Sequence, residues 1–404
     1  MAICQGKVSF AIGEATVRPP PKVLTLKSCW QFLNSLFILK LIGYSGGKLL
    51  LLPAEIPLGK PSPDSLQRIG AAGPPLTTPA AVPLAPLTIG GETIPLGKRV
   101  RLDLPVARLT TGTMMSLPVT VISGKKPGPR LWLSAAIHGD ELNGVDIIRR
   151  VAKSLRPNRL AGSVIAVPVV NIFGLLEQSR YLPDRRDLNR AFPGSARGSM
   201  ASRLAALFMR EVVSQCTHGI DLHTAAIHRI NLPQVRADLD NPATYDFAKA
   251  FGAPVIIHAS HRDGSLRQAA ARRKIPTLLY EAGEALRFDE AAIQTGVDGI
   301  YRVMAYLGMY TPPPMAQPTT LEVRDTRWVR ASRGGIWHRA VSLGDEVKQR
   351  QPLGFISDTF GDKPMQVRSP RAGIVIGHGQ NPLVNQGDAL VHVASVRAEV
   401  GQEQ

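Results

Sequence analysis

Short apolar runs alternate with one-sided apolar stripes through the middle of the chain. Residues 130–137 and 163–170 are almost entirely apolar, which is typical of strands buried on both faces of a sheet. Between them, residues 141–155 place apolar side chains three and four positions apart, as one face of a helix requires. A buried strand, a helix and a second buried strand predict a parallel α/β unit.

The same alternation continues towards the C-terminus. A second helical stripe covers residues 200–216, and short apolar runs follow at 219–223, 254–258 and 276–280. Because helical patterns separate these runs, we expect them to be further strands of one sheet. The fold class expected is therefore α/β, with a mixed, largely parallel sheet flanked by helices.

Two changes in composition divide the chain into parts. An Ala/Pro-rich tract closes residues 1–85, which we expect to be an N-terminal extension and linker that is poorly ordered. Residues 86–312 are expected to form the α/β domain. After the Pro-rich break at 311–314, short apolar runs separated by Gly and Asp predict a small all-β domain over residues 320–396. A short tail at 397–404 ends the chain.

The charge of the chain narrows the choice of partner. Its 404 residues include 48 Lys+Arg and 31 Asp+Glu, a formal net charge of +17. Such a charge would suit nucleic-acid binding, but no basic stripe with interleaved aromatic residues and no zinc-finger spacing occurs. We therefore expect no nucleic-acid partner and a basic surface that is solvated or suits anionic substrates, with homo-oligomer formation left open.

Membrane and disulfide chemistry are also disfavoured. The most apolar stretch, residues 30–42, is interrupted by Asn34, Ser35 and Lys40. A membrane-spanning helix needs about 20 apolar residues, so we expect no membrane span and a cytoplasmic protein. The 3 Cys are an odd and scattered set that cannot form a Cys-based zinc site, so any metal must use His and carboxylate ligands.

Ionisable residues close two of the apolar strands, at the edge where open parallel sheets bind ligands. His138 and Glu141 follow the first buried run, and His223 ends a later one, two residues after Asp221. Because imidazole and carboxylate are zinc ligands, we expect one Zn²⁺ per chain, with Asp221 orienting His223; the alternative is a hydrogen-bonded core histidine. His258 and the histidine three residues later have no carboxylate nearby on their loop and are left out of the ligand set.

Four further residues suit the hydrolysis of a carboxylate substrate. Arg180 could polarise a carbonyl oxygen, and the adjacent Asn189 and Arg190 could hold a carboxylate. Glu281, at the tip of an apolar strand, suits a general base that takes a proton from zinc-bound water. The alternatives are surface salt bridges for the arginines and a charge at the start of a helix for Glu281.

Together, in type and in order, these segments resemble the succinylglutamate desuccinylase/aspartoacylase family, zinc hydrolases related to the zinc carboxypeptidases. The resemblance runs from about residue 86 to residue 396. It implies a zinc carboxypeptidase-like α/β fold. It also implies that Zn²⁺ is bound by a His-x-x-Glu pair and a later His, which match His138, Glu141 and His223.

The resemblance assigns roles to the other residues as well. Arg180 matches the family's Arg that polarises the scissile carbonyl, and Glu281 matches its catalytic Glu. Asn189 and Arg190 match the pair that binds the substrate carboxylate. The function implied is that of a zinc-dependent hydrolase of non-peptide C–N bonds, which removes an acyl group from an N-acyl amino acid or a similar small carboxylate.

Two other functions remain open at this point. A metallocarboxypeptidase would use the same atoms on a peptide C-terminus and would differ in the size of its pocket. A non-catalytic basic binding protein would keep the fold but lack a ligand or the base, whereas all of these residues are present in the chain.

Deletion of residues 1 to about 80 should leave folding and activity intact. A segment with little periodic apolar surface contributes little to a hydrophobic core. The melting temperature and the turnover of the truncated and full-length proteins would be compared. A truncated protein that aggregates, or that melts much earlier than the full chain, would contradict the expectation.

Overall fold

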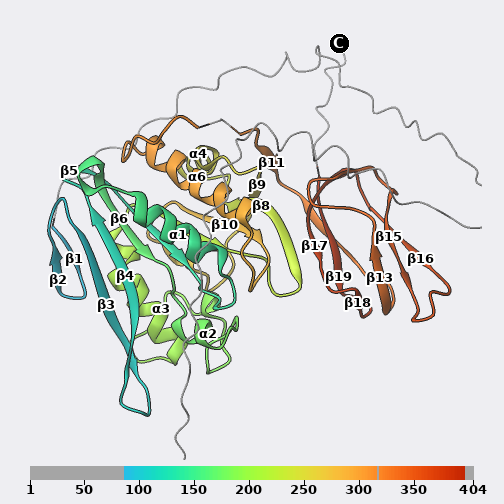
Figure 1. Ribbon diagram of the computed structural model, residues 1–404, viewed down its shortest axis with the longest axis horizontal. Helices are drawn as coiled ribbons and strands as arrows, with labels where there is room; N and C mark the ends of the chain where they lie inside the picture. Colours follow the sequence, from blue (N-terminus) through green and yellow to red (C-terminus); the bar gives the residue numbers. More distant parts are fainter. Residues whose placement is uncertain (1–85, 316–317, 396–404) are drawn as a thin grey trace, which may run out of the picture. The chain divides into compact units, whose positions relative to one another are not determined.

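The computed structural model describes residues 86–315 and 318–395 (Figure 1). The extension expected over residues 1–85, the apolar stretch at 30–42 within it, and the tail at 397–404 lie outside these residues. In the part of the chain that is described, no helix combines the length and the apolar character that a membrane crossing requires.

A mixed sheet forms the centre of the fold (Figure 1). Its strands in the α/β part are β3 (Arg99–Arg108), β4 (Met114–Ser123), β5 (Lys126–Ala135), β6 (Ala161–Val167), β7 (His218–His223), β8 (Arg229–Ala237), β9 (Val255–His258) and β10 (Thr277–Gly283). Strands β10, β7, β5 and β6 pair in parallel in that order, and β4 and β3 extend the sheet in antiparallel fashion beyond β6. Strand β8 pairs antiparallel with β10 and parallel with β9.

Helices cover both faces of this sheet. The longer ones are α1 (Asn143–Ser154), α4 (Pro242–Phe251) and α6 (Glu290–Tyr306) in one core, and α3 (Met200–Glu211) and α5 (Leu266–Ala271) in the other. The short elements are β1 (Leu87–Ile89), β2 (Glu92–Ile94), α2 (Ile172–Leu176) and the 3₁₀ turns η2 (Pro157–Arg159), η3 (Leu188–Arg190) and η4 (Val213–Gln215).

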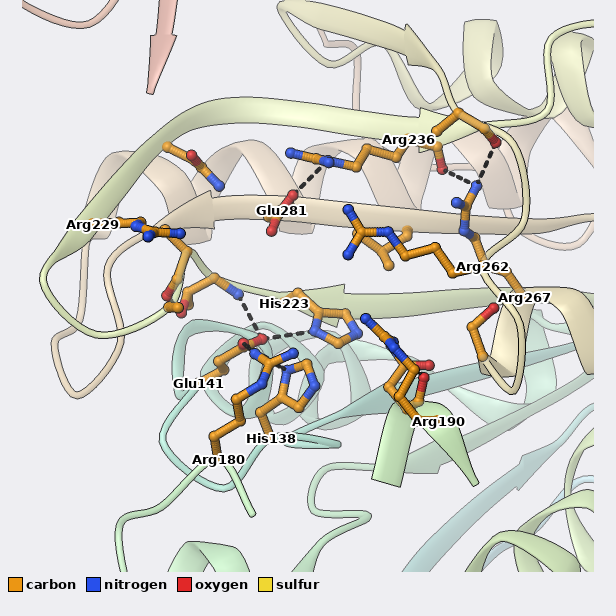
Figure 2. Close-up of a pocket in the computed structure, with 18 of the residues that line it drawn as sticks. His138, Glu141, Arg180, Arg190, His223, Arg229, Arg236, Arg262, Arg267 and Glu281 are labelled. Carbon is orange, nitrogen blue, oxygen red and sulfur yellow. Dashed lines mark hydrogen bonds and ion pairs between the residues drawn. The ribbon is translucent and has the colours of Figure 1, made fainter. Parts of the chain in front are cut away.

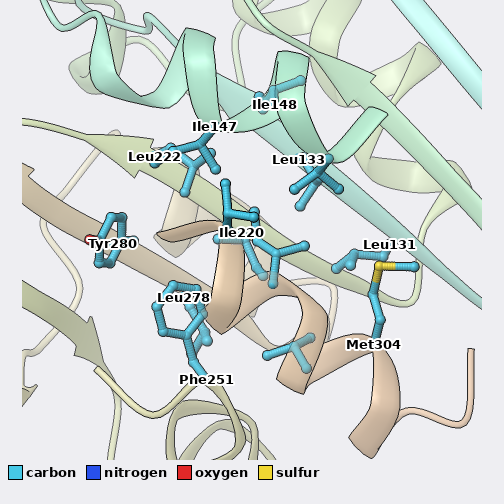
Figure 3. Close-up of a cluster of buried hydrophobic side chains, with 14 of the residues drawn as sticks. Leu131, Leu133, Ile147, Ile148, Ile220, Leu222, Phe251, Leu278, Tyr280 and Met304 are labelled. Atoms are coloured by element: carbon cyan, nitrogen blue, oxygen red, sulfur yellow. The ribbon is translucent and has the colours of Figure 1, made fainter. Parts of the chain in front are cut away.

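The second half of strand β5 shows why the central strands contain continuous apolar runs. Leu131 and Leu133 pack with residues of α1 and α6 in one core (Figure 3). Trp132 between them belongs to the core on the other face. Successive side chains of a strand point to opposite faces, so a strand covered on both sides needs a continuous apolar run. The predicted α/β fold, with its mixed and largely parallel sheet, is thereby confirmed.

The boundaries of the elements differ from the expected ones by a few residues. Strand β5 ends at Ala135, because Ala136 adopts a left-handed backbone conformation with φ of 47°. Helix α1 begins at Asn143, after the residues that turn from the strand into the helix. The helix expected over 200–216 ends at Glu211, and the turn η4 follows it.

The C-terminal part is all-β, as predicted, and its strands pair antiparallel with one another. Its strands are β11 (Leu321–Val323), β12 (Thr326–Arg330), β13 (Gly335–Arg339), β14 (Glu346–Val347), β15 (Pro352–Ser357), β16 (Met365–Arg368), β17 (Gly373–Gly379), β18 (Leu383–Val384) and β19 (Ala389–Ala394). Strands β16, β15, β13 and β18 form a separate sheet. Strands β12, β19 and β17 instead continue the central sheet, because β17 pairs with the start of β8. The sequence pattern did not indicate this continuity, and the domain boundaries stay predictions.

Helix α1 lies close against the sheet where it begins. A Cβ atom on Gly144 would lie 2.7 Å from the Cβ atoms of both Ala135 and Leu222, closer than side chains normally approach. Glycine therefore lets the start of α1 rest on the ends of β5 and β7. The connection between β5 and α1, which carries His138 and Glu141, is held against the sheet as a result.

Gly144→Val should lower the free energy of unfolding by at least about 2 kcal/mol, because the added carbons have no room between helix and sheet. Lys153→Val, at an exposed position of the same helix, is the matched control for helix propensity and should cost less than about 1 kcal/mol. Denaturant unfolding measures both variants. Equal destabilisation by the two substitutions would contradict the packing argument.

Candidate active site

Three buried side chains, here called the metal-ligand group, meet where β5 and β7 end (Figure 2). His138 Nδ1 lies 2.6 Å from Glu141 Oε1, and His223 Nδ1 lies 2.7 Å from Glu141 Oε2. The ligand atoms of the three residues lie within 4.8 Å of one another, so they could hold one metal ion. This is the set of ligands expected from the sequence.

Each imidazole of the group is also held from its outer side. His138 Nε2 lies 3.2 Å from Asp187 Oδ1, and His223 Nε2 lies 2.8 Å from Asp221 Oδ2. Metal-binding histidines usually donate their second ring N–H to a carboxylate in this way. The structure places Asp221 where the sequence analysis expected it. The sequence analysis missed Asp187, which reaches His138 from 49 residues further along the chain.

The balance of charge in the group fits a divalent cation. Burial alone would lower the pKa of His138 and His223, but Glu141 together with Asp187 or Asp221 raises the pKa of both. Burial would raise the pKa of Glu141, but the two histidines hold it well below its usual value. Each imidazole faces a carboxylate at both nitrogens, so it must carry two protons to satisfy both. A divalent cation at the Nδ1 atoms replaces two protons and leaves both outer hydrogen bonds intact, and the donor set suits Zn²⁺.

One cavity of about 780 Å³ brings together the metal ligands, the catalytic residues and the substrate-binding residues that the sequence predicts. These residues are His138, Glu141, Arg180, Asn189, Arg190, His223 and Glu281. The cavity lies at the carboxyl ends of the parallel strands, which is where open α/β sheets bind their ligands. The catalytic roles of these residues remain predictions.

Glu281 lies beside the metal-ligand group because of the register of the sheet. Strand β10 pairs in parallel with β7, and Glu281 is the direct partner of His223. The sequence analysis placed Glu281 at a strand tip, whereas β10 continues two residues further, to Gly283. Glu281 Oε2 lies 2.6 Å from Nε of Arg236 on β8. This ion pair joins two segments far apart in the sequence, and no local pattern marks Arg236.

The guanidinium of Arg180 lies against the metal-ligand group (Figure 2). It donates to Asp187 Oδ2 at 3.0 Å and to Glu141 Oε1 at 3.4 Å. Burial would raise the pKa of Asp187, but His138 and Arg180 hold it well below its usual range. The salt bridges of Arg180 are thus made with carboxylates of the site, and its role towards a substrate stays a prediction.

Asn189 and Arg190 line the same cavity from η3. Asn189 Oδ1 accepts a hydrogen bond from the backbone N–H of Leu266 at 3.0 Å, which leaves the amide N–H groups as donors for a ligand. Arg190 Nη1 donates to the backbone carbonyl of Asn189 at 2.5 Å. Among the described residues, no carboxylate pairs with Arg190, so its charge is available to an anion.

A second group of ligand atoms includes His258, which also lines the cavity. It consists of Asp238, Asp240 and His258 and is more exposed than the metal-ligand group. The expectation that no carboxylate lies near His258 was wrong, because Asp240 Oδ2 approaches its Nε2 to 3.7 Å. Asp240 also pairs with Arg324 at 2.7 Å, which neutralises its charge. This group is therefore the weaker metal ligand of the two.

The fold and the site together define a mixed α/β protein with a candidate metal site at the carboxyl ends of its parallel strands. The family model for the succinylglutamate desuccinylase/aspartoacylase catalytic domain matches residues 127–307. The family that the sequence resembles is therefore the one whose catalytic domain matches this part of the chain.

Individual relatives match over most of their length. The N-alpha-acetyl-L-2,4-diaminobutyric acid deacetylase of Halomonas elongata is 28% identical over 316 residues, which are 74% of this chain and 92% of that protein. The crystal structure of a succinylglutamate desuccinylase/aspartoacylase from Rhodobacter sphaeroides matches this chain with a TM-score of 0.66 and 28% sequence identity. The match covers 74% of this chain and 96% of that one. The product-bound ectoine utilization protein EutE (DoeB) from Ruegeria pomeroyi shares the fold, with a TM-score of 0.68, 24% identity and coverage of 74% and 97%.

His223→Ala should lose most of the zinc that the purified protein binds, which we expect to be about one ion per chain, because it removes one of three ligands. His258→Ala is the matched control, since it removes a histidine of the same cavity and should keep the zinc. Elemental analysis measures both. Full zinc in the His223 variant, or loss in the His258 variant, would contradict this assignment.

Proposed function

We propose that the protein is a zinc-dependent deacylase that hydrolyses the amide bond of an N-acyl amino acid or of a similar small carboxylate. The observation that carries this proposal is the convergence of a buried metal-ligand group, a carboxylate and a carboxylate-binding pair on one cavity. The relative from Halomonas elongata, which is named as a deacetylase of an N-acetyl amino acid, supports the same type of reaction.

The metal-ligand group, His138, Glu141 and His223, would hold the ion. Zn²⁺ bound there supplies Lewis-acid catalysis, which activates water and polarises the substrate carbonyl. Asp187 and Asp221 orient the two imidazoles through their outer nitrogens, so that both inner nitrogens face one point.

Glu281 moves the proton in this reaction. Its carboxylate takes a proton from the attacking water and later gives that proton to the nitrogen of the leaving amine. The strand register supports this role, because it sets Glu281 next to His223 on the same face of the sheet. The ion pair with Arg236 keeps the carboxylate in place over the cavity.

Three residues bind and orient the substrate. Arg180 donates to the carbonyl oxygen as negative charge develops on it, and a fixed cation at that position lowers the barrier. Asn189 and Arg190 hold the substrate carboxylate, since an amide and a guanidinium together offer several N–H donors. The scissile amide then lies between the metal-ligand group and Glu281.

Glu281→Gln should retain its zinc and lose turnover by a factor of at least about 10², because an amide of the same size cannot accept the proton. Glu284→Gln is the matched control, a nearby carboxylate that pairs with Arg287 and should leave turnover within about threefold. Zinc content and hydrolysis of N-acetyl and N-succinyl amino acids are measured for both. Loss of zinc from the Glu281 variant, or loss of turnover only in the Glu284 variant, would show that the base has been misassigned.

A further inference from the structure

One polar side chain interrupts the apolar run of strand β5. Ser134 stands within residues 131–137, whose other members are all apolar, and its side chain is fully buried. A hydroxyl buried without a partner destabilises a fold, whereas an alanine would pack there without that cost. The proposed reaction gives Ser134 no role. The partner of the hydroxyl therefore indicates what this residue contributes.

The register of the sheet sets Ser134 beside Asp221. Strands β5 and β7 pair in parallel, and the two residues are direct partners, with their side chains on the same face. Ser134 Oγ donates to Asp221 Oδ1 at 2.8 Å, and Asp221 Oδ2 lies 2.8 Å from His223 Nε2. Because His223 Nδ1 lies 2.7 Å from Glu141 Oε2, a line of hydrogen bonds runs from the interior of β5 to the metal-ligand group.

The two carboxylates that hold the imidazoles of the metal-ligand group are supported in different ways. Asp187 accepts hydrogen bonds from the Arg180 guanidinium at 3.0 Å and from a backbone N–H at 2.8 Å. Asp221 is fully buried. Within residues 86–315 and 318–395, its carboxylate has two hydrogen-bond partners, His223 and the Ser134 hydroxyl, and no arginine or lysine pairs with it. The support of Asp221 on the side away from His223 thus comes from one hydroxyl.

That hydroxyl fixes the orientation of the carboxylate. A carboxylate that is held at one oxygen alone can rotate about its bond to Cβ. With Oδ1 bonded to Ser134, Oδ2 stays directed at His223, so the outer N–H of the imidazole keeps its acceptor and Nδ1 stays directed at the metal-ligand group. Removal of the hydroxyl leaves a buried oxygen unpaired, which favours rotation of the carboxylate and loosens the imidazole.

We propose that Ser134 is a positioning residue for the metal centre, which acts through Asp221 and His223 to raise the affinity for Zn²⁺. This inference rests on the proposed function, in which the metal-ligand group holds that ion. It extends the site by one residue into the core of the sheet, beyond the reach of solvent and substrate.

The affinity of the full-length protein for Zn²⁺, measured by competition with a zinc-binding dye, tests the inference. Ser134→Ala should raise the Kd for Zn²⁺ by at least about fivefold, because Asp221 loses the donor that orients it. Ser134→Thr keeps the hydroxyl and should leave the Kd within about twofold of wild type. Ser163→Ala is the matched control. It removes a buried hydroxyl from β6, at the position that pairs with Arg130, and should also leave the Kd within about twofold.

A dissociation constant separates positioning from plain stabilisation. A hydroxyl that only stabilised the fold would stabilise the zinc-free and the zinc-bound protein equally, so its removal would leave the Kd unchanged. A folded Ser134→Ala protein with an unchanged Kd therefore overturns the inference. If that variant does not fold, Ser134→Cys, a weaker donor of similar size, should raise the Kd by at least about twofold. An unchanged Kd in the cysteine variant overturns the inference equally.

A double-mutant cycle tests the route through Asp221. Asp221→Asn alone should weaken zinc binding by at least about tenfold, since the imidazole of His223 loses its charged acceptor. In that background, Ser134→Ala should change the Kd by less than about twofold, because the carboxylate that it orients is already gone. Effects of the two substitutions that add in full overturn the proposed route.

These measurements need no turnover, so the inference and the proposed function can fail separately. A protein that binds zinc more tightly because of Ser134, but hydrolyses no N-acyl amino acid, supports the inference and overturns the proposed reaction. A protein that hydrolyses these compounds with a zinc affinity that does not depend on Ser134 overturns the inference alone.

Discussion

The burial of Glu141 is the constraint on which the rest of the site depends. A carboxylate that is only 2% exposed loses its hydration and must be compensated by fixed partners. Two imidazoles and the backbone N–H of Thr224, at 3.1 Å, provide that compensation here. These partners come from the end of β7 and from the connection between β5 and α1, which the close approach at Gly144 presses onto the sheet. The metal-ligand group therefore depends on both the order of the strands and the position at which α1 begins. A displacement of either element would leave the buried carboxylate of Glu141 without its partners.

Features that depend on local sequence could be predicted. Features that depend on contacts between residues far apart in the sequence could not. The central strands were recognisable because a strand covered on both faces is apolar throughout, and the ligands were recognisable because they close such strands. Asp187 and Arg236 were not predicted, because each contacts a residue from a distant segment. Asp187 contacts His138, and Arg236 contacts Glu281. Around either residue the local sequence is that of an ordinary polar loop or strand. The same limit explains why no carboxylate was expected near His258: Asp240, which approaches it, comes from a different segment of the chain.

The C-terminal strands are more closely tied to the site than their composition suggested. Their short β runs indicated an independent all-β unit, and a separate four-stranded sheet does form there. Trp328 and Arg324 from this part nevertheless line the same cavity as the metal-ligand group. The electrostatic character of the cavity thus arises from both parts of the chain, with the metal-ligand group near the ends of the parallel strands and Arg324 in the C-terminal part.

The pairing of β17 with β8 has a consequence for how this architecture diversifies. On the side of β8 away from β10, residues 234–237 are bonded to β9, whereas residues 229–231 are bonded to β17. Two residues of that latter stretch, Arg229 and Asn231, line the cavity. Insertions or substitutions in the C-terminal strands would therefore move this wall of the cavity and leave the proposed metal ligands in place. If the proposed function holds, the residues that select a substrate and those that react with it lie on parts of the chain that can change separately in evolution.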